Sequence, residues 1–496
     1  MQAATNESEP ISGASHFVKS ISAFGGAQVV SWIVTSTLLM LLPRYFSDAV
    51  VGKLVLASTL STLVGLVTEL GVTTYLAREI AREPGQADWL IGHTFSIRIV
   101  SSCLGLIMTV GVTHLAGYDE ATRQVVYIFC LGYLIAPLAA VTKGALQGFH
   151  QLSAMAGFSA MISLLYLGLT LAAIYLGTGL VVLASIELLT GAAGLVLATR
   201  VMLRFTRLSL RFEWSAWRGI LLGSLPFFTW GVATLIYSKV DILQLSLMTS
   251  DAVVGWYAVA YRIIGIPAFL PSIVMTVTFP ALAATVSDPP TFHAIARRSI
   301  RAVVLACLPM GIGIMVLADK AIELLGFSDG FVHSTVLIVI LAPHIVLIGL
   351  NMQLATILNT SGSPWKWTIG GVGASLLNPL LNLVAIPYAH SVYGNGAIGA
   401  AGVTVLTEVL LFVVALRFMP RGLIDGATIV YIVKCLVAGL VMAAVVWPAR
   451  DLPIAAPIAL GGLTYGLCTL AMGAISIDDL RSLRQVWGHR VAAASA

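Results

Sequence analysis

Long apolar runs are the feature that most constrains what this chain can fold into. Fourteen mainly apolar runs follow one another along the 496 residues, and about 20 apolar residues in a helix span the hydrocarbon core of a bilayer. Only 10% of the residues are charged, whereas a soluble globular chain carries about 25%. The chain therefore has too few polar groups to cover a surface in water. The sequence predicts an all-α integral membrane protein with about fourteen transmembrane helices.

Short polar loops separate the expected helices. Their approximate ranges are 20–43, 49–76, 90–114, 123–145, 152–177, 180–203, 219–249, 252–284, 299–318, 333–359, 367–388, 397–418, 425–447 and 453–475. The helices over 219–249 and 252–284 are longer than a bilayer requires, so we expect them to tilt, kink or extend beyond it. Pro267, Pro271 and Pro280 should kink the second of these because proline has no backbone N–H to donate.

Lys and Arg residues in the loops favour one orientation. If the N-terminus is cytoplasmic, the segments on that side carry eighteen Lys and Arg residues against five on the other side, and cytoplasmic loops are normally the more positive ones. The bias predicts that both termini are cytoplasmic and that the helix count is even. The net charge of +5 is spread over short loops, which argues against a nucleic-acid partner.

A six-residue sequence occurs twice. Residues 47–52 and 250–255 both read Ser-Asp-Ala-Val-Val-Gly, and each copy lies at the outer turn of an expected helical hairpin. The copies are six helices apart, so both halves enter the membrane in the same direction, as a parallel repeat with a pseudo-two-fold axis along the membrane normal. The expected parts are a cytoplasmic segment (1–19), an N-lobe of six helices (20–205), a C-lobe of six helices (206–420), two C-terminal helices (421–476) and a cytoplasmic tail (477–496).

Four stretches of sequence, taken in order, carry a resemblance to a known family. They are Glu69–Val72 with Ala77–Arg82, Lys239 and Asp241 with Val254–Arg262, Leu358–Gly362 with Asn378, Asn382 and Ile386–Pro387, and Tyr393–Ala401 with Thr407–Glu408. With the helix count, they resemble the polysaccharide transporter branch of the multidrug/oligosaccharidyl-lipid/polysaccharide exporter superfamily, the O-antigen flippase type. The drug-exporting branch usually has twelve helices, so the last two helices favour the polysaccharide branch.

The resemblance implies a flippase and not an enzyme. Its substrate would be a polyprenyl-pyrophosphate-linked oligosaccharide in the inner membrane of a prokaryote, and its partners would be membrane lipids and polysaccharide polymerase or export machinery. Two similar lobes around a cleft suit alternating access. No cofactor and no metal site is expected. The sequence has no G-x-x-x-x-G-K-[ST] loop, so transport would use an H⁺ or Na⁺ gradient, the membrane potential or the substrate gradient.

Two other functions remain open. The first is an ion-coupled exporter of drugs or other small solutes with the same fold. The second is a membrane-embedded glycan polymerase or ligase, which would need a large outer loop for sugar chemistry. The longest expected outer loop, at about 319–332, is short, which counts against this enzyme.

Charged residues inside the expected helices are costly and therefore indicate either a function or a partner. Lys239, Asp241 and Arg262 should lie at similar depths on neighbouring helices. We interpret them as a candidate site for the pyrophosphate headgroup, because the planar fork of Arg binds two oxygens while Lys acts as a point charge. Asp241 would orient or balance the two cations. The alternative is a buried ion pair of Asp241 that only joins the helices.

Five further charges fall inside the expected helices. Glu187 and Glu408 are candidates for ion coupling, because a buried carboxylate favours binding of a proton or cation. Glu408 could instead pair with Lys434, which lies at an equal distance from the loop that joins their helices. Glu69 and Arg98 are expected to form a second structural pair, since they lie at similar depths on successive helices.

Overall fold

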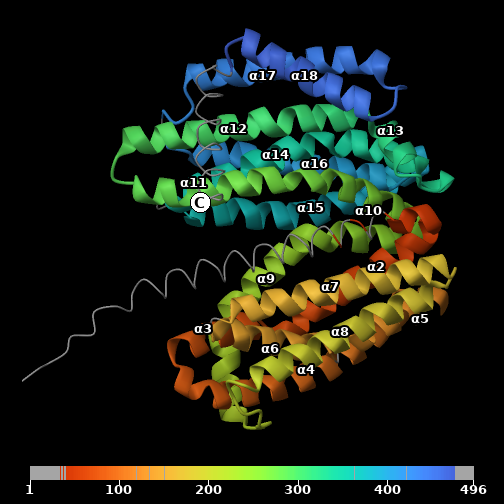
Figure 1. The fold of residues 1–496 in the computed structure, drawn as a ribbon, viewed down its shortest axis with the longest axis vertical. Helices are drawn as coiled ribbons and strands as arrows, with labels where there is room; N and C mark the ends of the chain where they lie inside the picture. Colours follow the sequence, from red (N-terminus) through yellow and green to blue (C-terminus); the bar gives the residue numbers. More distant parts are fainter. Residues whose placement is uncertain are drawn as a thin grey trace, which may run out of the picture. The chain divides into compact units, whose positions relative to one another are not determined.

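The regular structure of the chain is helical throughout the residues that the computed structural model describes (Figure 1). These residues are Val34, Thr37 and 41–474, except 119, 133–134, 150, 362–363 and 421. By their contacts the helices fall into two units, residues 1–255 and 256–496.

The first unit contains eight α-helices of the described chain and the start of a ninth. They are α2 (Asp48–Glu69), α3 (Val72–Arg82), α4 (Ala87–Leu115), α5 (Glu120–Leu131), α6 (Ala136–Gly148), α7 (Leu152–Tyr175), α8 (Leu180–Met202) and α9 (Trp214–Met248), with the 3-10 turn η1 (Pro84–Gln86) before α4. A core of buried apolar side chains, which includes Leu76, Ile91, Leu146 and Met202, joins α3, α4, α6 and α8. This core holds the start of α9 through Ile220.

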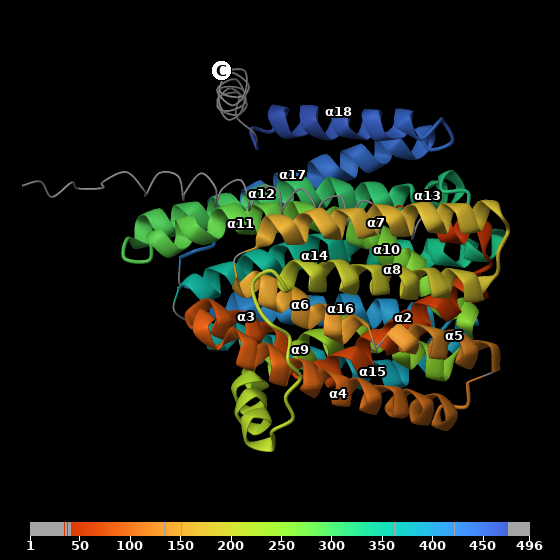
Figure 2. The same ribbon diagram turned by 60° about the horizontal axis from the view of Figure 1, so that its bottom comes forward.

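The second unit begins within α10 (Asp251–Gly265), whose first turn belongs to the first unit. Its other elements are η3 (Ile266–Ala268), α11 (Phe269–Ala284), α12 (Pro289–Val316), α13 (Ala318–Leu324), η4 (Asp329–His333), α14 (Ser334–Thr360), α15 (Pro364–Tyr393), α16 (Ala397–Phe418), α17 (Gly426–Val446), η5 (Trp447–Ala449) and α18 (Ala455–Ala471). Helix α14 is central, because it packs against α11, α12, α15 and α16. Figure 2 shows α17 and α18 as a pair beside α12.

Eleven helical segments within the described residues are long and apolar enough to cross a membrane. They are 48–66, 84–115, 122–148, 157–175, 181–202, 251–284, 289–316, 329–360, 365–393, 397–418 and 426–449. Helix α9, with 35 residues, and α18, with 17, occupy two further predicted positions. The structure agrees with the predicted all-α membrane fold of about fourteen helices. The expected helix over 20–43 lies largely outside the described residues.

One expected helix, over 49–76, is two helices in the structure. Helix α2 ends at Glu69, and both Leu70 and Gly71 have left-handed backbone conformations, with φ of 55° and 68°. A Cβ on Gly71 would also lie only 2.5 Å from the backbone nitrogen of Phe228. The left-handed pair ends the helix, whereas the apolar sequence continues through it, so hydropathy gave no indication of the break.

The structure interrupts the expected helix at Pro267, whereas Pro271 and Pro280 lie within α11. The helix expected over 252–284 is divided into α10 and α11 by the 3-10 turn Ile266–Ala268, which contains this proline. Another difference concerns α12, which begins at Pro289, ten residues before the expected start. Its N-cap residue Asp288 accepts a hydrogen bond from the backbone N–H of Thr291, and such a cap lets a helix start in a polar segment.

The boundary between the units differs from the expected boundary between the lobes. Helix α9 packs against α2, α3 and α4, so the contacts place the division after Gly255 and not between residues 205 and 206. Glycine allows this close packing, since the side-chain ring of Tyr75 in α3 lies directly on Gly223 of α9. The contacts therefore place α9 in the first unit, and the expected division into two six-helix lobes stays a prediction.

The two copies of the repeated hexapeptide pack against each other. A Cβ on Gly52 would lie 1.8 Å from the backbone oxygen of Asp251, and a Cβ on Gly255 would lie 2.3 Å from that of Asp48. The glycine of each copy thus contacts the aspartate of the other copy. A two-fold axis produces this kind of reciprocal contact. Lys53 adds an ion pair with Asp251 at 3.6 Å. The superposition of the two six-helix lobes stays a prediction.

Candidate functional site

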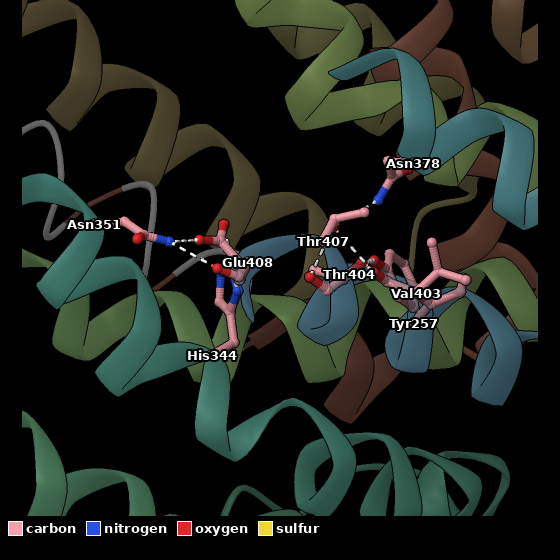
Figure 3. Close-up of polar contacts among 9 residues, drawn as sticks. Tyr257, His344, Asn351, Asn378, Val403, Thr404, Thr407 and Glu408 are labelled. Carbon is pink, nitrogen blue, oxygen red and sulfur yellow. Dashed lines mark hydrogen bonds and ion pairs between the residues drawn. The ribbon is translucent and has the colours of Figure 1, made fainter. Parts of the chain in front are cut away.

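A buried cluster of polar side chains surrounds Glu408 in the second unit (Figure 3). Glu408 of α16 is 2% exposed, and its neighbours on α14, His344 and Asn351, are 6% and 3% exposed. The Asn351 side-chain amide donates hydrogen bonds to Glu408 Oε2 at 2.6 Å and to the Glu408 backbone oxygen at 3.1 Å. His344 Nδ1 lies 3.8 Å from Glu408 Oε1. The carboxylate is thus held between two polar groups within an apolar helix bundle.

Helix geometry explains why these side chains meet. His344 and Asn351 are seven residues apart, close to two turns of a helix, so both lie on the face of α14 that packs against α16. The ring of Tyr261 lies beside His344, with centroids 5.8 Å apart. Thr404 precedes Thr407 by three residues and Glu408 by four, so these side chains extend the polar surface along α16.

A second group of buried polar residues continues from the cluster along α16. The Asn378 side-chain amide donates to Thr407 Oγ1 at 3.4 Å, and the Asn382 amide donates to Asn378 Oδ1 at 3.1 Å. The hydroxyl groups of Tyr257 and Thr404 are 3.2 Å apart. Buried polar groups are costly in a membrane protein and usually face the interior of a bundle or a transport pathway. The strip from Glu408 to Asn382 is therefore the candidate functional site of this unit.

Two polar atoms next to Glu408 have no hydrogen bond of their own among the described residues. His344 Nδ1 and Asn351 Oδ1 are buried and have no hydrogen-bond partner among the described residues. The separation of 3.8 Å between His344 and Glu408 is longer than a hydrogen bond, but a proton on Nδ1 would make the imidazole a donor toward the carboxylate. A proton between these two side chains, or a small cation on carboxylate and amide oxygens, is the ligand that this chemistry favours.

Lys434 is the partner expected for Glu408 from the sequence. The contacts described for Glu408 are with α14, whereas Lys434 is half-buried on α17, which packs against α12 and α18. Asp425 directs α17 toward α12: it accepts a hydrogen bond from the backbone N–H of Thr428 and pairs with Arg297 at 2.5 Å. The hydrogen bond from the Thr428 hydroxyl lowers the pKa of Asp425. The ion pair of Glu408 with Lys434 is thus not among the contacts described, and it stays a prediction.

Arg98 also has a partner that the sequence did not indicate. Its side chain is 2% exposed, and Nη1 donates to the backbone oxygen of Thr68 at 2.8 Å. The expected pair with Glu69 is not among the described ion pairs, but the Glu69 carboxylate interacts electrostatically with the Arg98 guanidinium, so this pair stays a prediction. A cation at the carbonyl end of a helix is favourable, so Arg98 stabilises the end of α2, one residue before Glu69.

The remaining predicted site residues lie in different parts of the chain. Lys239 and Asp241 are on α9 in the first unit, and Arg262 is on α10 in the second. Asp241 is 8% exposed, while Lys239 and Arg262 are half-buried. Glu187 is exposed on α8. The headgroup site and the ion-coupling role of Glu187 stay predictions.

Sequence reasoning missed His344 and Asn351. The signal was present, because two polar residues with helical spacing interrupt an expected apolar helix over 333–359. However, Asn is uncharged and His is counted as neutral at pH 7, so a search for charged residues inside the helices did not find them.

Residues 17–286 match the family described as polysaccharide biosynthesis protein. Two similar proteins come from Haloferax volcanii. The probable low-salt glycan biosynthesis flippase Agl15 is 25% identical over 223 residues, and the probable flippase AglR is 26% identical over 247 residues. The matches cover 44% and 48% of this chain, and 45% and 50% of the relatives. The chain thus spans about half the length of the curated relatives it matches.

Solved structures of transporters have a similar fold. The lipid II flippase MurJ in an inward closed conformation gives a TM-score of 0.71 at 15% identity, covering 90% of this chain and 97% of that one. An inward-facing multidrug resistance MATE transporter of the MOP superfamily gives 0.57 at 16% identity, covering 78% and 97%. At these identities the likeness is one of fold.

Proposed function

Because this chain belongs to the polysaccharide biosynthesis protein family, a branch of the multidrug/oligosaccharidyl-lipid/polysaccharide exporter superfamily, we propose that it moves a lipid-linked oligosaccharide across its membrane. The family match over residues 17–286 is the observation that carries this proposal. Both relatives from Haloferax volcanii are named as probable flippases. The proposed substrate is a polyprenyl-pyrophosphate-linked oligosaccharide in a prokaryotic inner membrane. The protein acts as a transporter and not as an enzyme, alongside polysaccharide polymerase or export machinery.

Coupling to an ion is proposed at the Glu408 cluster. A proton or Na⁺ that binds beside Glu408 neutralises a carboxylate in a site with little water, where electrostatic interactions are strong. Glu408 and its partners lie on α14 and α16, so a change in their charge acts on the packing of those two helices. An ion shifts a conformational equilibrium only if it binds one state better than the other. Glu187 is a second candidate for the same role.

Reconstitution into lipid vesicles tests the function. A polyprenyl-pyrophosphate-linked sugar with a fluorescent label on the glycan is placed in both leaflets, and a membrane-impermeant quencher reports which labels face outward. Vesicles with the protein should exchange the label between leaflets, and vesicles with denatured protein should not. If the protein instead moves only cationic dyes, it is an exporter of small solutes.

We further predict that Arg262 binds the anionic headgroup. Arg262→Lys keeps the charge but loses the two-oxygen fork, so phosphate binding should weaken and the apparent KM for the labelled lipid should rise about tenfold. Arg262→Ala should abolish exchange in vesicles while leaving a folded protein. The control is the double variant Arg262→Ala/Asp241→Ala. Restored exchange in this variant would show that Arg262 only balances Asp241.

The proposed orientation has its own test. Both termini should be cytoplasmic, because loop Lys and Arg residues lie mainly on one side. A reporter that fluoresces only in the cytoplasm, fused after Ala496, should therefore be bright. A dark fusion with normal amounts of protein in the membrane would contradict the orientation and the even number of helices.

A further inference from the structure

A pocket in the first unit lies outside the Glu408 cluster and the expected headgroup site. Its volume is about 350 Å³, within the size range of small-molecule sites. It is formed where the end of α3, the turn η1 and the starts of α4 and α9 meet. Its polar and aromatic lining consists of Tyr75, Glu79, Glu83, Gln86, Trp89 and Ser215.

The aromatic walls of this pocket are held in place. The Arg78 guanidinium lies over the Tyr75 ring, 5.4 Å from its centroid. Gly223 also packs closely on this ring, since a Cβ added to Gly223 would lie 2.4 Å from a ring carbon. Trp89 packs edge to face on His93, with centroids 4.8 Å apart, yet 36% of it stays exposed. A ligand would therefore meet aromatic surfaces that are already positioned, which lowers the entropy cost of binding.

The lining combines three kinds of group. Glu79, Glu83 and the Gln86 amide offer hydrogen-bond acceptors, and Ser215 offers a hydroxyl. Trp89 and Tyr75 offer aromatic faces, and Leu90, Ala216 and Ile220 complete an apolar wall. A sugar ring matches this combination, because its hydroxyl groups donate hydrogen bonds while its C–H face packs on apolar and aromatic surface.

The charges in the pocket favour a neutral ligand. Two carboxylates repel a phosphate or a uronate, so the pyrophosphate of a lipid-linked substrate does not fit here. Arg78 pairs with Glu79 at 2.7 Å and offsets one of the two charges, which weakens the attraction of a cation, while the charge of Glu83 remains and repels an anion. Glu83 also accepts a hydrogen bond from the Gln86 amide at 2.5 Å.

We infer that this pocket binds a neutral sugar residue of the transported glycan, apart from the headgroup. The inference rests on the proposed flippase function and names a part of the substrate that the first unit recognises. Under the proposed orientation, α3 and the start of α9 lie at the cytoplasmic end of the unit, where Arg78 and Arg82 are expected. The glycan would therefore be bound on the side from which it is exported.

The test fills the pocket and leaves its polar groups in place. Gly219 lines the pocket, and an added Cβ there would have no atom within 4 Å, so Gly219→Leu places a side chain in open space. The matched control is Gly111→Leu on α4, where the added Cβ is equally free. Each protein is placed in lipid nanodiscs prepared without sugar detergents. Binding is measured by saturation-transfer NMR with millimolar glucose, N-acetylglucosamine, glucuronate or choline.

The inference predicts signals from glucose or N-acetylglucosamine with the wild type and with Gly111→Leu. Gly219→Leu should reduce these signals at least about fivefold, and glucuronate should give none, because the carboxylates repel it. An equal signal in Gly219→Leu would overturn the assignment of the site. A signal from choline alone would overturn the ligand class in favour of a cation site.

The vesicle assay separates this inference from the proposed function. If the wild type exchanges the labelled lipid but binds neither neutral sugar, the pocket assignment is wrong and the flippase stands. If the neutral sugars bind and Gly219→Leu blocks them while no lipid is exchanged, the pocket is a sugar site and the flippase proposal fails.

Discussion

Replacement of Glu408 by Gln should remove the ion dependence that we propose for transport. The amide oxygen of Gln can still accept the hydrogen bond from Asn351, which Glu408 Oε2 now accepts at 2.6 Å, so the packing of α14 on α16 should survive. The negative charge that faces His344 is lost. The proposed acceleration of lipid exchange by an ion gradient should then be absent. We expect the driven rate to fall by about tenfold or more, which corresponds to about 1.4 kcal/mol of lost coupling.

Two comparisons distinguish coupling from stability. Gln353 is fully buried on α14, the helix of Asn351, and its amide donates to the backbone oxygen of Pro271 at 3.2 Å. Gln353→Met should therefore lower the melting temperature but keep the response to the gradient. Glu408→Ala should lower the melting temperature and also abolish the response to the gradient, since it removes the charge and leaves the Asn351 amide without its side-chain acceptor, a loss of about 1–3 kcal/mol. A Glu408→Gln protein that still responds to H⁺ and Na⁺ gradients like the wild type would exclude Glu408 from coupling.

Replacement of Gly52 by Ala should prevent correct folding of the first unit. The new Cβ would lie 1.8 Å from the backbone oxygen of Asp251, and no rotamer change can move a backbone atom. The two copies of the repeated hexapeptide would have to separate, which also strains the ion pair between Lys53 and Asp251. Overpacking of this kind costs about 1–3 kcal/mol, occasionally more. We expect loss of monodisperse protein in size-exclusion chromatography or a clearly lower melting temperature.

The reciprocal contact supplies the matched variants. Gly255→Ala should have a similar effect, because its Cβ would lie 2.3 Å from the backbone oxygen of Asp48. Gly111→Ala and Gly462→Ala are the controls, since nothing lies within 4 Å of a Cβ at either position, and alanine favours a helix over glycine by about 0.5–1 kcal/mol. If Gly52→Ala and Gly111→Ala melt at the same temperature, the close approach of the two copies is not required for folding.

Only part of the candidate site could be predicted from the sequence. Glu408 could be found because a carboxylate inside an apolar run has a cost that some partner must offset. Its partners could not be found in the same way, since they depend on which helix covers that face of α16. Equal distances from the connecting loop favoured Lys434 as the partner, whereas the described contacts of Glu408 are with His344 and Asn351 on α14. The sugar pocket depends even more on tertiary structure, because α3, α4 and α9 contribute to it from distant parts of the sequence.

The fold class followed from local composition because the bilayer allows few alternatives. A backbone that crosses lipid must satisfy its hydrogen bonds within each segment, so an apolar run of sufficient length is already a helix. The duplicated hexapeptide likewise indicated a two-fold relation, and the reciprocal contact of Gly52 and Gly255 agrees with it. These features need no knowledge of distant residues.

Tertiary structure decided where helices break and which helices meet. The end of α2 at Leu70 and Gly71 depends on two left-handed residues and on the close approach of Phe228 from α9. The position of α17 depends on Asp425 and its pair with Arg297 of α12. In both cases the deciding contact joins segments more than a hundred residues apart, and hydropathy, which averages over neighbours in sequence, contains no information about such contacts.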